Sequence, residues 1–134
     1  MPLVVDASAA LYLMTAERPT RLDAYELVAP VLFLSERTSS LATGAFRTAL
    51  PQAVLLAAFD RLESLPVRIV PSDRPHRLAA VELARSLGWA KTYDAEYVSV
   101  AQRLGCPLLT TDERLARGAG HLVEMLDPRT LEPA

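Results

Sequence analysis

Short apolar runs alternate with helical patterns along this chain, and that alternation constrains its fold more than any other feature. The runs that predict strands are 3–5, 29–32, 67–70, 107–111 and 121–125. The helices predicted around them are 7–14, 20–27, a segment that carries Glu36 and ends near Gly44, 51–65, 73–87, 92–104 and 113–117. Buried strands that alternate with helices are typical of a parallel sheet with right-handed crossovers. We therefore expect an α/β fold, and 134 residues are the size of one domain covering 1–134.

Charge and cysteine content narrow the class of protein. The chain has 14 basic and 16 acidic residues and a net charge of −2, which argues against a sequence-blind DNA coat but not against a nuclease with an acidic site. Only His76 and His121 accompany the single Cys106, so neither an internal disulfide nor a Cys/His zinc site is expected. The longest apolar run, 27–34, is far shorter than the ~20 residues of a membrane span. No basic residue precedes Arg18 to suggest a secretory signal, so we expect a soluble, cytoplasmic protein.

Two acidic residues directly follow predicted strands. Asp6 comes after the run 3–5, and Asp112 ends the run 107–111. In open parallel sheets, ligands bind beyond the carboxyl ends of the strands, so these two carboxylates are candidates to meet at one edge of the sheet. Each also fits the N-cap of the helix that follows it, because Asp is a favoured N-cap residue.

Two further acids lie early in predicted helices. Asp94 shares a helix face with Tyr97, Val98 and Ala101, which look like a core-facing stripe. A carboxylate at the end of a buried stripe is costly unless it is paired or binds a metal, although an Asp in the first turn also stabilises the helix dipole. Glu36 lies on a small polar face, which fits either the wall of a cleft or plain solvent exposure.

Together the four acids predict a metal-dependent site. Like charges that gather at one edge of a sheet need cations to neutralise them, and carboxylate oxygens suit Mg²⁺ or Mn²⁺. Two such ions about 3.5–4 Å apart would clamp the attacking and leaving oxygens of a phosphodiester. Such a mechanism needs no nucleophilic side chain, which agrees with the absence of a Ser-His-Asp or Cys-His arrangement.

Four short motifs occur in an order and spacing that match a known family. They are Val5-Asp6-Ala7-Ser8-Ala9, Ala29-Pro30 followed by Glu36, Thr92-Tyr93-Asp94-Ala95-Glu96-Tyr97, and Leu109-Thr110-Thr111-Asp112-Glu113-Arg114-Leu115. Through them the chain resembles the PIN-domain ribonucleases of the VapC toxin type. The resemblance implies a five-stranded parallel sheet flanked by helices and a Mg²⁺- or Mn²⁺-dependent endoribonuclease. It also implies that the catalytic and metal-binding residues are Asp6, Glu36, Asp94 and Asp112, supported by the hydroxyls of Ser8 and Thr110.

The same resemblance implies the partners of the protein. They are an RNA substrate such as a tRNA or ribosomal RNA, a cognate antitoxin and a second copy of the chain in a homodimer. The sequence departs from the family at 37–40, where polar residues replace an apolar stretch that often contains an Asn. The segment 42–51 also looks shorter than in the family, where this region shapes the substrate groove and contacts the antitoxin.

Several residues near the four acids are candidates to contact RNA. Arg37, Lys91 and Arg114 lie close to them in sequence and could hold phosphates, although each also fits ordinary solvated charge. Trp89 is the only tryptophan and precedes the helix of Asp94. A base stacked on such a ring is worth ~1–3 kcal/mol, but packing against the core or across a dimer interface is the favoured interpretation.

Rival functions fit the sequence less well. A phosphoryl-transfer enzyme of the haloacid-dehalogenase kind needs an Asp two residues after Asp6, where this chain has Ser8. A two-component receiver needs a Lys after the fifth strand, and none follows it. The serious alternative is a catalytically silent PIN fold that binds RNA or protein. That alternative predicts that replacing Asp94 by Asn leaves function intact, whereas the nuclease loses activity with little loss of stability.

Overall fold

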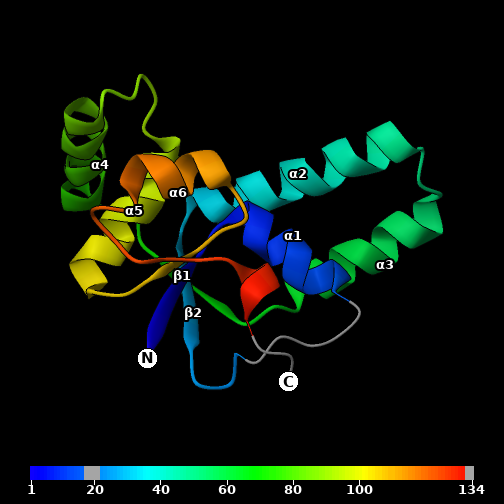
Figure 1. The fold of residues 1–134 in the computed structure, drawn as a ribbon. Coiled ribbons are helices and arrows are strands. Elements are labelled where there is room, and N and C mark those ends of the chain that lie inside the picture. The colour runs from blue at the N-terminus through cyan, green and yellow to red at the C-terminus, as the bar shows by residue number, and fades with distance from the viewer. Residues whose placement is uncertain (17–21, 132–134) are drawn as a thin grey trace.

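The fold is one parallel sheet covered by helices, as the alternating pattern predicts (Figure 1). A computed structural model describes residues 1–16 and 22–131. Its elements are β1 (Pro2–Val5), α1 (Ala7–Thr15), β2 (Glu26–Pro30), α2 (Leu32–Thr48), α3 (Gln52–Glu63), β3 (Val67–Val70), α4 (Arg74–Leu87), α5 (Tyr93–Leu104), β4 (Leu108–Leu109), α6 (Glu113–Ala119), β5 (Met125–Leu126) and the 3₁₀ turn η1 (Pro128–Thr130). The strands form a five-stranded sheet in the order β3-β2-β1-β4-β5, and all neighbouring pairs are parallel.

Strand β1 lies at the centre of the sheet and of the hydrophobic core. Leu3, Val4 and Val5 are fully buried, as expected for a strand covered on both faces. Val4 pairs with Val28 of β2 on one side and with Leu108 of β4 on the other. Because β1 and β4 run in parallel, their carboxyl ends open onto the same edge of the sheet.

The helices divide into two groups around the strands. Figure 1 shows α2 and α3 extending together away from the sheet, while α4 and α5 lie on the other side of the strands. Helix α1 packs against both α2 and α3, and α4 packs on α5. No helix within the described ranges is long and apolar enough to cross a membrane.

The segment that leads into β2 differs from the prediction. The helix predicted over 20–27 is wrong where the structure describes it, because Glu26–Pro30 forms a strand; positions 20 and 21 lie outside the described residues. The strand predicted over 29–32 therefore begins and ends earlier. The physical reason is that Leu27, Val28 and Ala29 are buried at the middle of the sheet, and a short apolar run suits a buried strand or a helix equally well.

Three other element predictions need correction. Helix α2 continues through Gly44 to Thr48, because one glycine inside a helix costs only ~1 kcal/mol relative to alanine and packing outweighs it. The last strand begins at Met125 rather than at His121. On α3, the spacing of Val54, Leu55, Ala58 and Leu62 predicts one buried face, and Leu62 is buried, but the side chain of Val54 is 50% exposed.

The spacing of Leu78, Val81 and Ala84 predicts the buried face of α4, and of these three only Ala84 is buried. Leu78 and Val81 are 43% and 55% exposed, whereas His76, Ala80 and Ala84 are buried. Small residues and a histidine face α5 because α4 packs closely on that helix, and His76 Nε2 lies 2.8 Å from Glu96 Oε1. Hydrophobicity alone therefore assigned Leu78 and Val81 to the buried face of this helix incorrectly.

Candidate active site

The four predicted acids line a single cavity at the carboxyl edge of the sheet. Asp6 follows β1, Asp112 follows β4, Glu36 lies in α2 and Asp94 lies in the first turn of α5. The cavity has a volume of about 140 Å³, and its remaining walls are formed by Ala7, Ser8, Ser40 and Tyr97. The structure thus brings together four residues that are far apart in the sequence.

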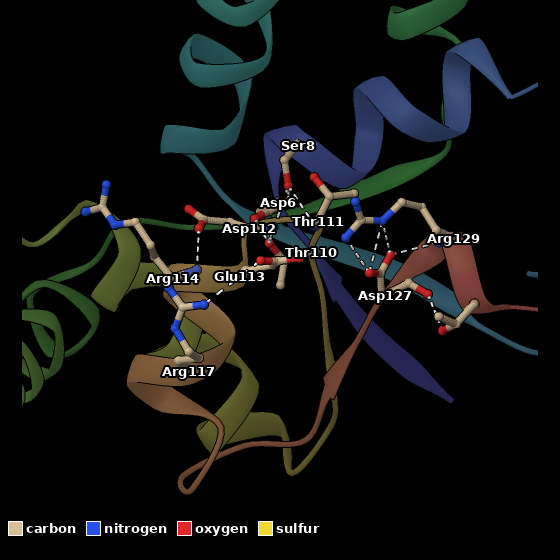
Figure 2. Close-up of polar contacts among 11 residues, drawn as sticks. Asp6, Ser8, Thr110, Thr111, Asp112, Glu113, Arg114, Arg117, Asp127 and Arg129 are labelled. Atoms are coloured by element: carbon tan, nitrogen blue, oxygen red, sulfur yellow. Dashed lines mark hydrogen bonds and ion pairs between the residues drawn. The ribbon is translucent and has the colours of Figure 1, made fainter.

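Asp6 is held on both of its carboxylate oxygens. Oδ1 accepts hydrogen bonds from Ser8 Oγ at 2.7 Å and from the Ala9 backbone N–H at 2.9 Å, while Thr110 Oγ1 donates to Oδ2. In Figure 2 these side chains point toward one another at the start of α1. Asp6 is therefore both the N-cap of α1 and a wall of the cavity. Burial raises its pKa, these hydrogen bonds oppose the rise, and the charge of Asp112 adds to it.

Two hydroxyl groups connect the ends of β1 and β4. Thr110 Oγ1 accepts a hydrogen bond from the Asp112 N–H at 2.9 Å, and Ser8 Oγ accepts one from the Thr111 N–H at 3.0 Å. Asp112 in turn caps α6, since its Oδ1 accepts from the backbone N–H groups of Arg114 and Leu115. Ser8 and Thr110 thus occupy positions that fix the two strand-end acids, which fits the supporting role predicted for them.

Glu36 and Asp94 form the opposite wall and have fewer partners. Tyr97 Oη donates to Glu36 Oε1 at 2.6 Å. Among the described residues, the Asp94 carboxylate makes no hydrogen bond, and the charges of Asp112 and Arg114 lie near enough to act on it. Burial raises the pKa of both acids; the charge of Asp112 raises that of Asp94 further, and Arg114 lowers it.

This donor set suits a hard divalent cation. Carboxylate oxygens are the protein ligands that Mg²⁺ and Mn²⁺ prefer. A cation would offset the burial, and the lesser mutual repulsion, that raise these pKa values. Within 1–16 and 22–131, no three acid, histidine or cysteine side chains converge closely enough to hold an ion among them. One or two carboxylates together with water are the usual protein environment of Mg²⁺, and pairs of these acids fit that pattern.

Of the three predicted phosphate contacts, Arg37 is placed differently from expectation. Its side chain is buried, its Nη2 lies 2.9 Å from Glu63 Oε2, and its guanidinium covers the ring of Phe33. The prediction that Arg37 contacts phosphate does not fit this position, because α2 turns that face toward α3. Lys91 and Arg114 are exposed and line a second cavity that adjoins the acids.

Tyr97 is a site residue that sequence reasoning missed. The sequence places it in the core-facing stripe of its helix, and its side chain is indeed buried. Its hydroxyl nevertheless reaches the cavity and holds Glu36. The signal was its position three residues after Asp94 on the same helix face.

Comparison with known proteins agrees with this geometry. A family model described as the PIN domain matches residues 3–120. The chain belongs to the PIN-domain family. Ribonuclease VapC12 from Mycobacterium tuberculosis is 34% identical over 128 residues, covering 92% of this chain and 96% of VapC12. The predicted resemblance to the VapC-type PIN domains is therefore confirmed.

Solved structures of other PIN-like chains show the same fold. PAE2754 from Pyrobaculum aerophilum matches with a TM-score of 0.73 and 24% identity, covering 97% of this chain and 94% of that chain. VapBC-5 from Mycobacterium tuberculosis, a member of the VapBC family of toxin–antitoxin systems, matches with a TM-score of 0.61 and 20% identity over 94% of this chain and 98% of that chain.

Proposed function

We propose that this PIN-domain protein is a Mg²⁺- or Mn²⁺-dependent endoribonuclease and the toxin of a toxin–antitoxin pair. The observation that carries the proposal is that Asp6, Glu36, Asp94 and Asp112 line one cavity at the edge of the sheet. The identity to a ribonuclease over nearly the whole chain supports RNA as the substrate. We extend the substrate class to a structured RNA such as a tRNA or ribosomal RNA.

The proposed reaction is hydrolysis of a phosphodiester by a two-metal-ion mechanism. When bound, the divalent ions activate the attacking water and neutralise charge on the phosphate and the leaving oxygen. The four carboxylates would hold the ions. Ser8 and Thr110 keep the carboxylate of Asp6 oriented, and Tyr97 orients that of Glu36. This fixed arrangement favours catalysis because little reorganisation is needed when charge develops in the transition state.

The proposed protein partners are a cognate antitoxin and a second copy of the chain. VapBC-5, which shares the fold, belongs to a toxin–antitoxin family. Helices α2 and α3 expose apolar side chains that a partner chain would cover: Phe46 is 87%, Leu56 53% and Val54 50% exposed. Burial of such surface is favourable at roughly 25 cal/mol per Å².

The proposed function is tested by cleavage of total cellular RNA and sequencing of the new 5′ ends. The reaction is run with Mg²⁺, with Mn²⁺, with a chelator, and with the Asp94→Asn variant. Asp60→Asn is the matched control, because Asp60 is exposed on α3, away from the acid cavity. Discrete ends that require both a divalent ion and Asp94 are the expected result. Equal cleavage by the Asp94→Asn protein would mean that the cleavage does not depend on this acid cavity. No cleavage by folded wild-type protein free of antitoxin would favour the silent binding module.

A further inference from the structure

A second, larger cavity adjoins the acid cavity and shares Glu36 and Asp94 with it. Its volume is about 580 Å³, within the range of about 300–1,000 Å³ that is usual for pockets that bind small organic groups. Its other walls include Trp89, Lys91, Tyr93, Arg114 and Leu115. A group bound there would lie directly beside the acids.

Trp89 forms a fixed wall of this cavity. Its ring packs against the buried Ala80, Ala84 and Ala95 between α4 and α5, which confirms the packing interpretation made from the sequence. It also rests on α6, where a methyl group added at Gly118 would lie 3.0 Å from the indole Cζ2. Because neighbours on α4, α5 and α6 hold its ring, Trp89 is a fixed part of the cavity wall.

Tyr93 supplies a second aromatic ring and is freely accessible. It is the first residue of α5, four positions after Trp89, and 52% of its surface is exposed. Aromatic rings bind nucleobases by stacking, whatever the base, since every base has a π-face. The pair therefore fits a planar heterocycle better than an aliphatic ligand.

Lys91 and Arg114 add positive charge to the same cavity. Both side chains are exposed, and neither forms a salt bridge in the part of the chain that the structure describes. Arg114 lies near enough to Asp94 to lower the pKa of that carboxyl. Unpaired cations beside a metal-binding acid are placed to hold a phosphate that neighbours the one being cleaved.

We propose that Trp89, Lys91, Tyr93 and Arg114 form a nucleotide subsite that takes one unpaired nucleotide next to the scissile phosphate. The aromatic rings of Trp89 and Tyr93 stack on its base, and the side chains of Lys91 and Arg114 bind its phosphate. The inference rests on the proposed ribonuclease function and narrows its substrate to RNA that is single-stranded or looped at the cleavage point. A base inside a duplex is stacked and paired, so it would enter only at the cost of extrusion.

Because Trp89 is the only tryptophan, its fluorescence reports binding without any need for cleavage. The titration uses the Asp112→Asn protein with Mg²⁺, so that RNA stays intact while Asn preserves the N-cap of α6. The probes are oligo-uridine and oligo-adenosine pentamers, a blunt RNA duplex and inorganic phosphate. We expect saturable quenching by both pentamers, weaker binding of the duplex and no saturable change with phosphate.

Substitutions then distinguish the contribution of the aromatic rings to RNA binding from that of the cations. In the same background, Tyr93→Ala should raise the Kd of the pentamers about 5- to 100-fold, the usual worth of one stacked base. Lys91→Gln and Arg114→Gln should each lower the slope of log affinity against log salt by about 0.7. The controls Leu104→Ala and Arg47→Gln change an exposed apolar residue at the end of α5 and an exposed arginine of α2, and they should leave both quantities unchanged. Circular dichroism establishes that each variant is folded.

The subsite is overturned if the pentamers do not quench, if the duplex binds as tightly, if phosphate quenches equally, or if folded Tyr93→Ala binds normally. A failure of the nuclease looks different. In that case wild-type protein cleaves no RNA, the pentamers still quench the fluorescence of Trp89, and the Tyr93→Ala substitution still weakens their binding. Cleavage that persists unchanged in a Tyr93→Ala protein with Asp112 intact contradicts the subsite and leaves the nuclease standing.

Discussion

The two walls of the acid cavity use the same kind of side chain in different ways. On the sheet side, Asp6 and Asp112 accept hydrogen bonds from hydroxyl or backbone groups and cap the helices that follow them. On the helix side, Asp94 has no hydrogen-bond partner within the described residues, and Glu36 has only the hydroxyl of Tyr97. The strand-end acids therefore support the fold as helix caps in addition to lining the cavity, whereas Asp94 lines the cavity without a hydrogen-bonded role in the fold.

This contrast shows how a stable protein compensates for the burial and mutual repulsion of several carboxylates in one cavity. Helix caps and buried hydroxyls stabilise the charged form of Asp6 and oppose the cost of burying it. Asp94 lacks that compensation, so its repulsion and burial are relieved only by a cation or by its neighbour Arg114. Substitutions on the two walls should accordingly affect activity and stability in different proportions.

The largest effect is expected for Asp94→Asn. It should lower the initial rate of RNA cleavage in Mg²⁺ by roughly 100-fold or more, because groups that face developing charge are worth about 10²–10³ in rate. Its urea unfolding midpoint at pH 7 should equal or exceed that of the wild type, since a repelled charge is removed. A large loss of stability would show that Asp94 supports the fold and would remove the distinction between the walls.

A smaller effect, now on stability, is expected on the sheet side for Thr110→Val. The hydroxyl of the buried Thr110 donates to Asp6 and accepts from the Asp112 N–H, and valine of the same shape does neither. The free energy of unfolding should fall by about 1–3 kcal/mol, the cost of buried polar groups left unpaired. Urea titration measures it against Thr48→Val, whose hydroxyl bonds only to Gly44 O at the exposed end of α2. Equal costs in the two variants would contradict the network at the sheet edge.

Next in size is Tyr97→Phe, which acts on the helix wall. It removes the hydroxyl that orients Glu36 but keeps the buried ring. Loss of a group that orients a metal ligand typically weakens metal affinity 10- to 100-fold, and we expect about tenfold for Mn²⁺ measured by calorimetry. Tyr93→Phe is the matched control, since that ring lies at the first residue of α5 and makes no bond to Glu36. Unchanged Mn²⁺ affinity in Tyr97→Phe would place Glu36 outside the metal site.

The positions of the two acids on the sheet side could also be predicted from the sequence by physical rules alone. An acid directly after a buried apolar run, found twice in a parallel α/β pattern, places Asp6 and Asp112 at one edge of the sheet. No such rule places Glu36, because a polar face on a helix fits a cleft or open solvent equally. Its place in the cavity was predicted from its position early in a helix and from the family resemblance.

Two sequence predictions were wrong because local sequence does not reveal where a residue points or what it pairs with. Arg37 is next to a site acid in sequence, but one step along a helix turns a side chain by about 100°, and packing of α2 on α3 decides that it pairs with Glu63. The segment 26–30 was misassigned for a related reason. A short apolar run carries no period, so only its pairing with β1 reveals a strand.

The smallest effect is a pH dependence of stability in the metal-free protein. The folded-state pKa of Asp94 lies above its ordinary value of 3.8, so between these two values the folded state holds a proton that the unfolded state has released. The stability that this proton contributes is fully present below the ordinary pKa and is lost as pH rises through the raised pKa. Asp6 and Glu36 act in the same direction.

The contribution of Asp94 to this pH dependence can be measured by comparing the wild type with Asp94→Asn. In chelator, the Tm of Asp94→Asn should match that of the wild type near pH 4 and exceed it increasingly toward pH 7, because only the wild type acquires the repelled charge. Mg²⁺ should close the gap at pH 7, since the ion neutralises that charge. Thermal scans at pH 4, 5, 6 and 7 measure both effects. A wild type that gains on the variant as pH rises would mean that attraction to Arg114 outweighs burial and the charge of Asp112, which would contradict a raised pKa for Asp94.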